Sequence, residues 1–108
     1  MAATIRITCV YGAPKGWQWA AHINQHARFP VAWVDGKETE LHWDRVTEIP
    51  VSSEEPHKLQ VFMRLIGLHW CPAEVEVQPI RDGESQSYEY RVEVNDRFVN
   101  RGQLTPIQ

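Results

Sequence analysis

Long apolar runs are missing from this 108-residue chain, which excludes a membrane-spanning helix, since such a helix needs roughly 18 consecutive apolar residues. The N-terminus also lacks a charged start followed by an apolar stretch, so no secretory signal is predicted and a cytoplasmic protein is expected. Basic residues are not in excess either, because 11 Lys and Arg stand against 14 Asp and Glu. This balance argues against a nucleic-acid-binding protein, which usually carries a basic stripe.

Motifs for catalysis are equally absent. The chain has no Gly-rich phosphate loop, no Ser nucleophile elbow and no paired-carboxylate signature. Its acidic residues alternate along predicted strands, as expected of a solvated face: Glu38, Glu40, Glu74, Glu76, Glu89 and Glu93. We therefore predict no catalytic residue, no cofactor and no enzyme activity.

Leucine is scarce, with five residues against eleven Val and seven Ile. Residues branched at Cβ pack well on a pleated sheet and lose rotamer freedom in helices. Seven Pro and six Gly further divide the chain into short pieces. The composition predicts an all-β protein.

Alternating apolar and polar residues predict about seven short strands, with turn signals roughly every 8–12 residues. The sequence lacks the strand–helix–strand rhythm that would suggest a parallel sheet. A two-sheet antiparallel β-sandwich, forming one domain over residues 1–108, would cover the apolar face of each strand. The predicted strands are Thr4–Tyr11, Val31–Val34, Glu38–Trp43, Val46–Val51, Lys58–Ile66, Ala73–Gln78 and Tyr88–Val94.

Three local features refine this prediction. The pair Asp35-Gly36 is typical of two-residue hairpins, because both central residues need a positive φ. Pro50 lacks a backbone donor, so its strand is expected at a sheet edge. The long connection at 12–29 is ambiguous, since Trp17–Arg28 carries apolar residues at helical spacing but an irregular course fits almost as well.

The remaining predictions concern segments without periodicity and the side chains that are expected to be buried. Leu68–Pro72 is expected to be a connector, and the tail beyond Gly102 shows no periodicity. Trp33 and Trp43 lie on strands flanking the hairpin and are expected in the core or as cross-strand partners. The residues predicted to be buried are Leu59, Val61, Val75 and Val92.

An apolar strand ending in Val-Asp-Gly, a short strand and a strand led by His follow one another at Ala32–Lys37, Thr47–Val51 and His57–Val61. In this order they resemble the PEGA-like and prealbumin-like sandwich domains of bacteria, and the resemblance extends loosely to Tyr88–Arg91 and Gly102–Leu104. It covers about two thirds of the chain, omits the long connection and lacks the Pro-Gly that the family favours before the third segment. The resemblance implies a sandwich fold and an accessory or binding role, with no catalytic residue.

Four residues have the types and spacing of a metal site: His22, His26, His69 and Cys71. The first two are four residues apart and would share one helix face, and the other two form a His-x-Cys pair. Zn²⁺ accepts such nitrogen and sulfur ligands. The alternative is that the five His have no common role, with His42 and His57 as solvated surface groups. A metal-binding protein or small enzyme is therefore the second hypothesis.

The two cysteines, Cys9 and Cys71, are open to three interpretations: buried free thiols, a disulfide or a reactive thiol. Cys9 lies on the apolar face of the first predicted strand. Structural disulfides are rare in a reducing compartment, so free buried thiols are favoured.

The five Trp are the most suggestive feature for function. Trp17, Trp19 and Trp70 fall in irregular segments, next to His residues, and aromatic loops can form an apolar binding surface. The leading hypothesis is a non-enzymatic binding module for a protein, peptide or carbohydrate that uses Trp17, Trp19, Trp70 and His69. Alternatively, the long connection with its Trp side chains simply caps an open end of the sandwich.

Overall fold

The computed structural model describes residues 2–12, 29–65, 68–94 and 100–107. This part of the chain consists of strands and turns without a helix, and the all-β prediction is confirmed. The predicted connection at 12–29 lies outside the described residues except for its two ends. The eight strands are β1 Ala2–Gly12, β2 Phe29–Val34, β3 Lys37–Glu40, β4 Val46–Ser52, β5 His57–Leu65, β6 Leu68–Val77, β7 Ser85–Val94 and β8 Asn100–Ile107.

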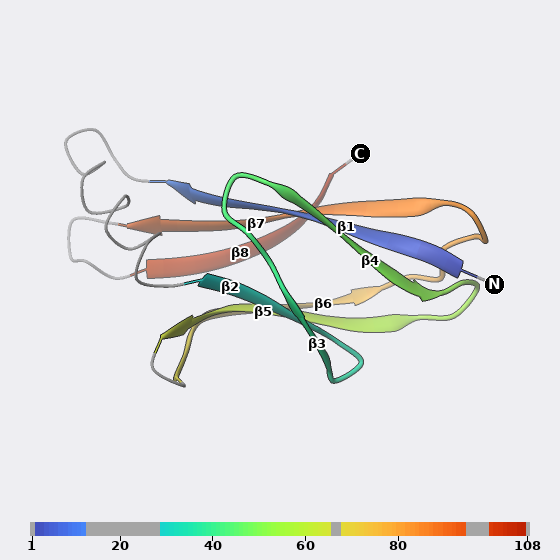
Figure 1. Cartoon of the computed structure of the whole chain (residues 1–108), viewed down its shortest axis with the longest axis horizontal. Helices are drawn as coiled ribbons and strands as arrows, with labels where there is room; N and C mark the ends of the chain where they lie inside the picture. The colour runs from blue at the N-terminus through green and yellow to red at the C-terminus, as the bar shows by residue number, and fades with distance from the viewer. Residues whose placement is uncertain (1, 13–28, 66–67, 95–99, 108) are drawn as a thin grey trace.

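The strands form two four-stranded sheets packed face to face, as Figure 1 shows. Sheet A has the order β4-β1-β7-β8 and sheet B the order β3-β2-β5-β6. A β-sandwich is thus confirmed, with eight strands in place of about seven. Pro50 lies in β4, an edge strand, as its missing donor predicted.

One pair of strands differs from the antiparallel prediction, because β1 and β7 run parallel. A parallel pair needs a long crossover between its strands. Here β4 and all of sheet B lie between β1 and β7 in the sequence, so no helix is needed to return the chain. This pairing therefore left no strand–helix–strand rhythm in the sequence.

The core lies between the sheets and follows the two-residue period of the strands. Ile5, Ile7 and Cys9 of β1 are fully buried, and so are Leu59 and Val61 of β5. Val92 of β7 is also buried as predicted, whereas Val75 is only partly buried because β6 is an edge strand of sheet B. Alternation therefore predicted the facing correctly, and the position of the strand decided how much each residue is covered.

The β2–β3 hairpin has the predicted turn. Asp35 and Gly36 both have positive φ, at 51° and 86°, as a two-residue hairpin with a type I′ turn requires. Beyond β3, Leu41 is buried and Trp43 bridges to Cys9, so this segment carries the chain from sheet B to sheet A. The Trp43 ring stacks on Tyr90 with centroids 6.4 Å apart and packs against the core at its margin.

The first half of β6 corrects the prediction of a connector at Leu68–Pro72. These residues pair with β5, but Met63 pairs with Trp70 and Val61 with Ala73, so Phe62 alone faces two residues of β6. Pro72 has no N–H for the ladder, and Cys71 has a positive φ of 51°. The resulting bulge interrupts the alternation, which explains why the sequence pattern did not indicate a strand.

The tail beyond Gly102 was also predicted wrongly, because it pairs with β7 as strand β8. At Gly102 the edges of the two sheets come together. A Cβ added there would lie 3.0 Å from the carbonyl carbon of Cys71 and even closer to its oxygen. Tyr90 donates its hydroxyl to the same Cys71 oxygen at 2.6 Å. Glycine and the bulge thus let β6 and β8 close one side of the sandwich.

Candidate functional site

The residues of the sequence-predicted site are mostly outside the described residues. This holds for Trp17, Trp19, His22 and His26, and for the side chains of His69 and Trp70, of which only the backbone is placed in β6. The structure therefore does not bring these groups together or separate them. The aromatic loop site and the His22, His26, His69 and Cys71 metal site remain predictions. Over the ranges that the structure covers, no group of three or more His, Cys, Asp or Glu could hold a metal ion.

Both cysteines are free thiols in the structure. Cys9 is fully buried in β1, and burial raises its pKa to about 12. Cys71 lies at the bulge and is only half-buried, so the prediction of two buried thiols is correct for Cys9 and wrong for Cys71.

These environments predict different reactivities, because the thiolate is the form that reacts. In the folded protein at neutral pH, Cys9 is expected not to react with a thiol reagent. In denaturant it should react without prior reduction. Labelling of a Cys71→Ser variant, followed by mass spectrometry, measures Cys9 alone. Rapid labelling of folded Cys71→Ser would contradict the burial of Cys9.

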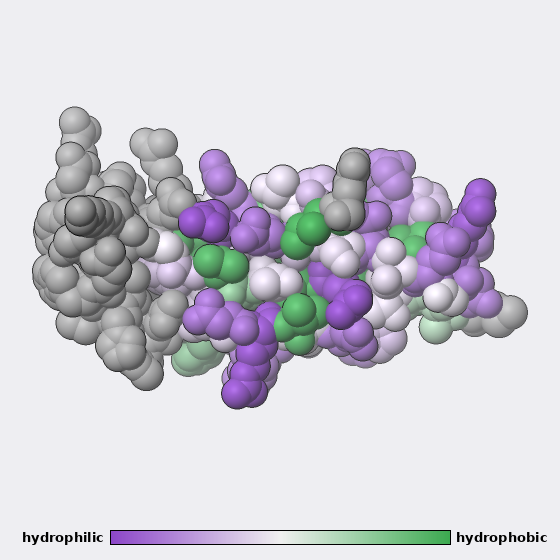
Figure 2. Space-filling view, turned by 90° about the horizontal axis from the view of Figure 1, so that it is seen from above, coloured by the Kyte–Doolittle hydropathy of each residue, from purple (hydrophilic) through white to green (hydrophobic). Residues whose placement is uncertain are grey.

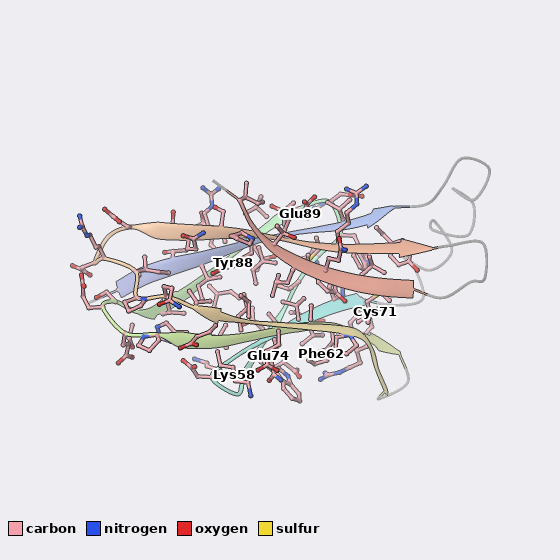
Figure 3. The ribbon with its side chains drawn as sticks, turned by 180° about the vertical axis from the view of Figure 1, so that it is seen from behind. Lys58, Phe62, Cys71, Glu74, Tyr88 and Glu89 are labelled. Atoms are coloured by element: carbon pink, nitrogen blue, oxygen red, sulfur yellow. The ribbon has the colours of Figure 1, made fainter. Side chains whose placement is uncertain are left out.

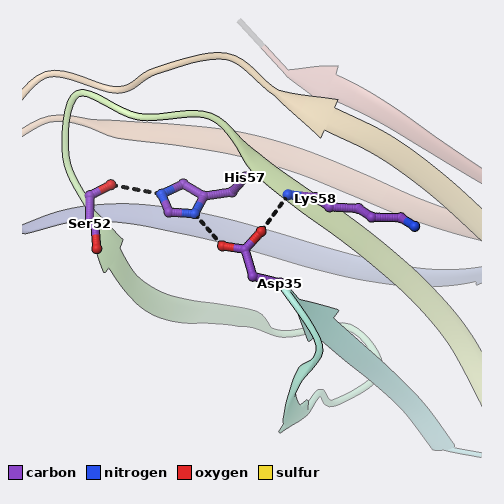
Figure 4. A network of polar contacts seen from close by, with 4 residues as sticks. All are labelled: Asp35, Ser52, His57 and Lys58. Atoms are coloured by element: carbon purple, nitrogen blue, oxygen red, sulfur yellow. Dashed lines mark hydrogen bonds and ion pairs between the residues drawn. The ribbon is translucent and has the colours of Figure 1, made fainter.

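The most organised polar group of the described residues surrounds His57, which the sequence suggested was a solvated group. Its side chain is only 4% exposed, in contrast to the exposed His42. The ring Nδ1 lies 2.5 Å from Oδ2 of Asp35, and Nε2 lies 2.7 Å from the carbonyl oxygen of Ser52 (Figure 4). The other carboxylate oxygen of Asp35 accepts the backbone N–H of Lys58 at 2.8 Å.

The pKa values of this pair move apart. The backbone N–H of Lys58 and the ring of His57 hold the pKa of Asp35 below its usual value. Burial alone would lower the pKa of His57, but its hydrogen bonds to Asp35 and Ser52 outweigh that effect, and the pKa is raised. Both shifts favour a protonated His57 paired with an ionised Asp35 through charge-assisted hydrogen bonds.

The His57 group is poorly suited to acid–base catalysis. Both ring nitrogens are already bonded, and Nε2 faces a backbone carbonyl rather than a hydroxyl nucleophile. A general base needs a free nitrogen within reach of the substrate proton. The Asp-Gly turn and the His-led strand both belong to the sequence pattern quoted above, but that pattern predicted a sandwich fold and a binding role and did not indicate that Asp35 and His57 are paired.

A cleft opens on the side of the sandwich opposite the β6–β8 contact, between β3 and β4. Its volume is about 520 Å³. The walls are apolar at Val34, Ile49 and Val51, and Asp35 and His57 also line it. Both bordering edge strands are blunted, since β3 has only four residues and β4 carries Pro50. These features disfavour addition of a further strand here.

The outer face of sheet B carries Trp33, which the sequence left open as a core residue or a cross-strand partner. Trp33 lies on this face, half-buried, with its ring 5.0 Å from that of Phe62 in an edge-to-face arrangement. Its indole N–H donates to Glu38 at 3.1 Å, and Glu38 also accepts two hydrogen bonds from Arg64. Trp33 is thus a cross-strand partner held in one orientation, not a member of the core between the sheets.

Next to Trp33 the outer face is hollowed by a dent of about 330 Å³. Phe62, Lys58 and Glu74 point away from sheet A on this side (Figure 3). The dent lies over the bulge, where Phe62 faces two residues of β6. It is lined by Trp33, Gln60, Val61, Phe62, Pro72, Ala73 and Glu74.

Sheet A presents a different face. Polar side chains, with single apolar ones between them, cover it in Figure 2. Ion pairs link Arg6 to Glu48 at 3.3 Å and Arg91 to Glu89 at 3.8 Å. Glu89 lies on this face, in agreement with the prediction of solvated acidic residues, and the face offers no aromatic platform among the residues described.

Comparisons with protein-family models, with curated proteins and with solved structures found no match. The similarity to PEGA-like and prealbumin-like domains therefore stays a prediction from the sequence motifs. Among the described residues, no helix is both long and apolar enough to cross a membrane.

Proposed function

We propose that this protein is a non-enzymatic binding module that recognises carbohydrate in the dent beside Trp33. The observation that carries the proposal is the lining of this dent. It combines an aromatic ring with the amide of Gln60 and the carboxylate of Glu74. A sugar ring presents C–H groups on its faces and hydroxyls at its edge, so it is served by an aromatic face bordered by planar hydrogen-bonding groups.

The size and rigidity of the dent support a small ligand. Its volume is near the lower end of the roughly 300–1,000 Å³ of small-molecule sites, which suits one or two sugar rings. Trp33 is fixed by Phe62 and Glu38, and Gln60 donates to Glu74 at 3.3 Å. Groups held in place before binding lose little entropy when the ligand arrives.

A peptide is a poorer occupant of the same dent. Extended peptides gain much of their affinity from the unpaired backbone groups of a sheet edge. The dent lies on the face of sheet B, over β5 and β6, and β5 is paired on both sides. The free edge of β6 meets β8 at Cys71 and Gly102. Side chains alone would have to hold a peptide here.

Replacing Trp33 by Ala is expected to abolish carbohydrate capture while the protein stays folded. Loss of a central aromatic anchor typically costs about 2 kcal/mol or more of binding, which is roughly a 30-fold loss of affinity. The cost in folding stability should be smaller than the roughly 3–5 kcal/mol of a fully buried Trp, because this ring is half exposed. Glycan-array binding and affinity electrophoresis in soluble polysaccharides measure the first effect, and urea unfolding measures the second.

Phe29→Ala is the matched control, because Phe29 is on the same strand and is 47% exposed but does not line the dent. It should bind like the wild type. Gln60→Ala should weaken binding through its lost amide. Retained binding by a folded Trp33→Ala variant, or no glycan bound by the wild type, would refute the proposal.

A further inference from the structure

Three chain segments, one of them distant in the sequence from the other two, meet at the His57 ring. Asp35 comes from the β2–β3 turn, Ser52 from the end of β4, and His57 from the start of β5 (Figure 4). The same three residues line the cleft between β3 and β4. The ring is therefore a joint between the two sheets at one end of that cleft.

We propose that this joint is a proton-operated latch. The doubly protonated ring of His57 holds the β2–β3 turn against the end of β4, and loss of one ring proton releases the turn and widens this end of the cleft. Asp35, Ser52 and His57 do not line the dent beside Trp33, so the latch does not rest on the proposed carbohydrate binding.

The hydrogen-bond geometry requires two ring protons. A carbonyl oxygen only accepts hydrogen bonds, and an ionised carboxylate also only accepts. Nε2 faces the Ser52 carbonyl and Nδ1 faces the Asp35 carboxylate, so each nitrogen must donate. A neutral ring carries one N–H, and its other nitrogen would then place a lone pair against an oxygen. With the side chain 4% exposed, water cannot readily compensate for the lost bond.

The charged groups around the ring favour the cation. Asp35 comes from the turn and Glu55 from the β4–β5 connection. Lys37 of β3 lines the same cleft, and Lys58 of β5 lines a second hollow with His57. The carboxylates of β6 that line this second hollow are Glu74 and Glu76, and Glu74 is paired with Lys58 at 3.3 Å. Four carboxylates against two ammonium groups leave an excess of negative charge near the ring.

The direction of the pH effect follows from the two shifts. The pKa of His57 is raised, so its contribution is complete below the pKa of an unfolded His and is lost as the pH rises through the folded value. The pKa of Asp35 is lowered, so its contribution is present above the pKa of an unfolded Asp and is lost as the pH falls through the folded value. The latch is closed between these limits and opens on either side.

Nitrogen-15 NMR of the His side chains tests the latch. In the full chain, both ring nitrogens of His57 should be protonated below its titration midpoint, and this midpoint should lie at a higher pH than that of His57 in the urea-unfolded chain, which serves as the control. The backbone amide of Lys58, which donates to Asp35, should exchange its hydrogen with solvent faster as the pH rises through the His57 midpoint. This acceleration should exceed the increase in exchange rate that hydroxide catalysis alone gives. A His57 midpoint in the folded protein at or below its midpoint in the unfolded chain would overturn the proposal.

Asp35→Asn is the decisive variant, because Asn tolerates the positive φ of this position and an amide N–H can donate to Nδ1. In this variant the neutral ring satisfies both contacts, donating to Ser52 and accepting from Asn. The His57 midpoint should therefore fall below its wild-type value, and the Lys58 amide should stay protected across the pH range. An unchanged His57 midpoint in Asp35→Asn would overturn the latch. The control variant His42→Gln should leave the His57 midpoint as in the wild type.

Discussion

Replacing Val61 by Asp is expected to abolish folding. Val61 is fully buried in the middle of β5, which is paired with β2 on one side and β6 on the other. A carboxylate at this position would face the core between the sheets, and the core cluster of the described residues is hydrophobic. Burying an unpaired carboxylate costs several kcal/mol, which is comparable to the roughly 5–15 kcal/mol stability of a whole domain.

Val46→Asp provides the control for this substitution. Val46 is 50% exposed and lies on the outer edge strand β4, so the same change of side chain should alter stability by less than about 0.5 kcal/mol. Far-ultraviolet circular dichroism and urea unfolding of both variants give the comparison. A soluble Val61→Asp variant that unfolds cooperatively would show that the inward face of β5 is assigned wrongly.

Which side chains of a strand face the core could be predicted from the sequence, because successive side chains point to opposite faces of the sheet. Cys9 in β1 and Leu59 and Val61 in β5 were assigned to the apolar faces by this period and are buried. The Asp35-Gly36 turn was predictable for a similar reason, since its chemistry depends on two adjacent residues.

Features that depend on distant segments could not be predicted in this way. The parallel pairing of β1 with β7 joins strands at opposite ends of the chain. The first half of β6 was not predicted as a strand because Cys71 and Pro72 form a bulge. Strand β8 was not predicted because Gly102 and Pro106 weaken its alternation of apolar and polar residues. Local propensity cannot show that a glycine is needed where another sheet approaches.

The candidate sites show the same limit. His57 was interpreted as a solvated group, since nothing local indicates that a turn 22 residues earlier supplies its carboxylate partner. Trp33 was left open between the core and a cross-strand role, and only its pairing with Glu38 on the outer face decided this. The polar contacts that define a site are mostly non-local, whereas the strand period is local.

Replacing Gly102 by Ala is expected to be the most damaging small change outside the centre of the core. The added Cβ would overlap the Cys71 carbonyl group and lie 3.2 Å from Cε1 of Tyr90. Strand β8 and the Cys71 carbonyl must then move apart, and displacement of this carbonyl is expected to break its hydrogen bond from Tyr90. Overpacking of about 1–3 kcal/mol and a lost hydrogen bond of about 1 kcal/mol together predict a loss of about 2–4 kcal/mol in unfolding free energy.

Gly83→Ala separates this effect from backbone strain. Gly83 has a φ of 81° and open space around its Cα, so Ala there should cost only the roughly 1 kcal/mol of a left-handed conformation. Gly102 has no positive φ, and its larger predicted loss is therefore due to the close approach of the two sheets. Equal losses at the two glycines in urea unfolding would contradict this explanation.

A double-mutant cycle with Tyr90→Phe completes the argument. Burial raises the pKa of Tyr90, so its hydroxyl stays protonated and donates to Cys71. Tyr90→Phe alone should cost about 1–2 kcal/mol, because the Cys71 carbonyl loses its donor. If Gly102→Ala has already separated β8 from β6, adding Tyr90→Phe should cost much less than it does alone. Additive losses would mean that the hydrogen bond survives in Gly102→Ala, and that this side of the sandwich accommodates a methyl group without opening.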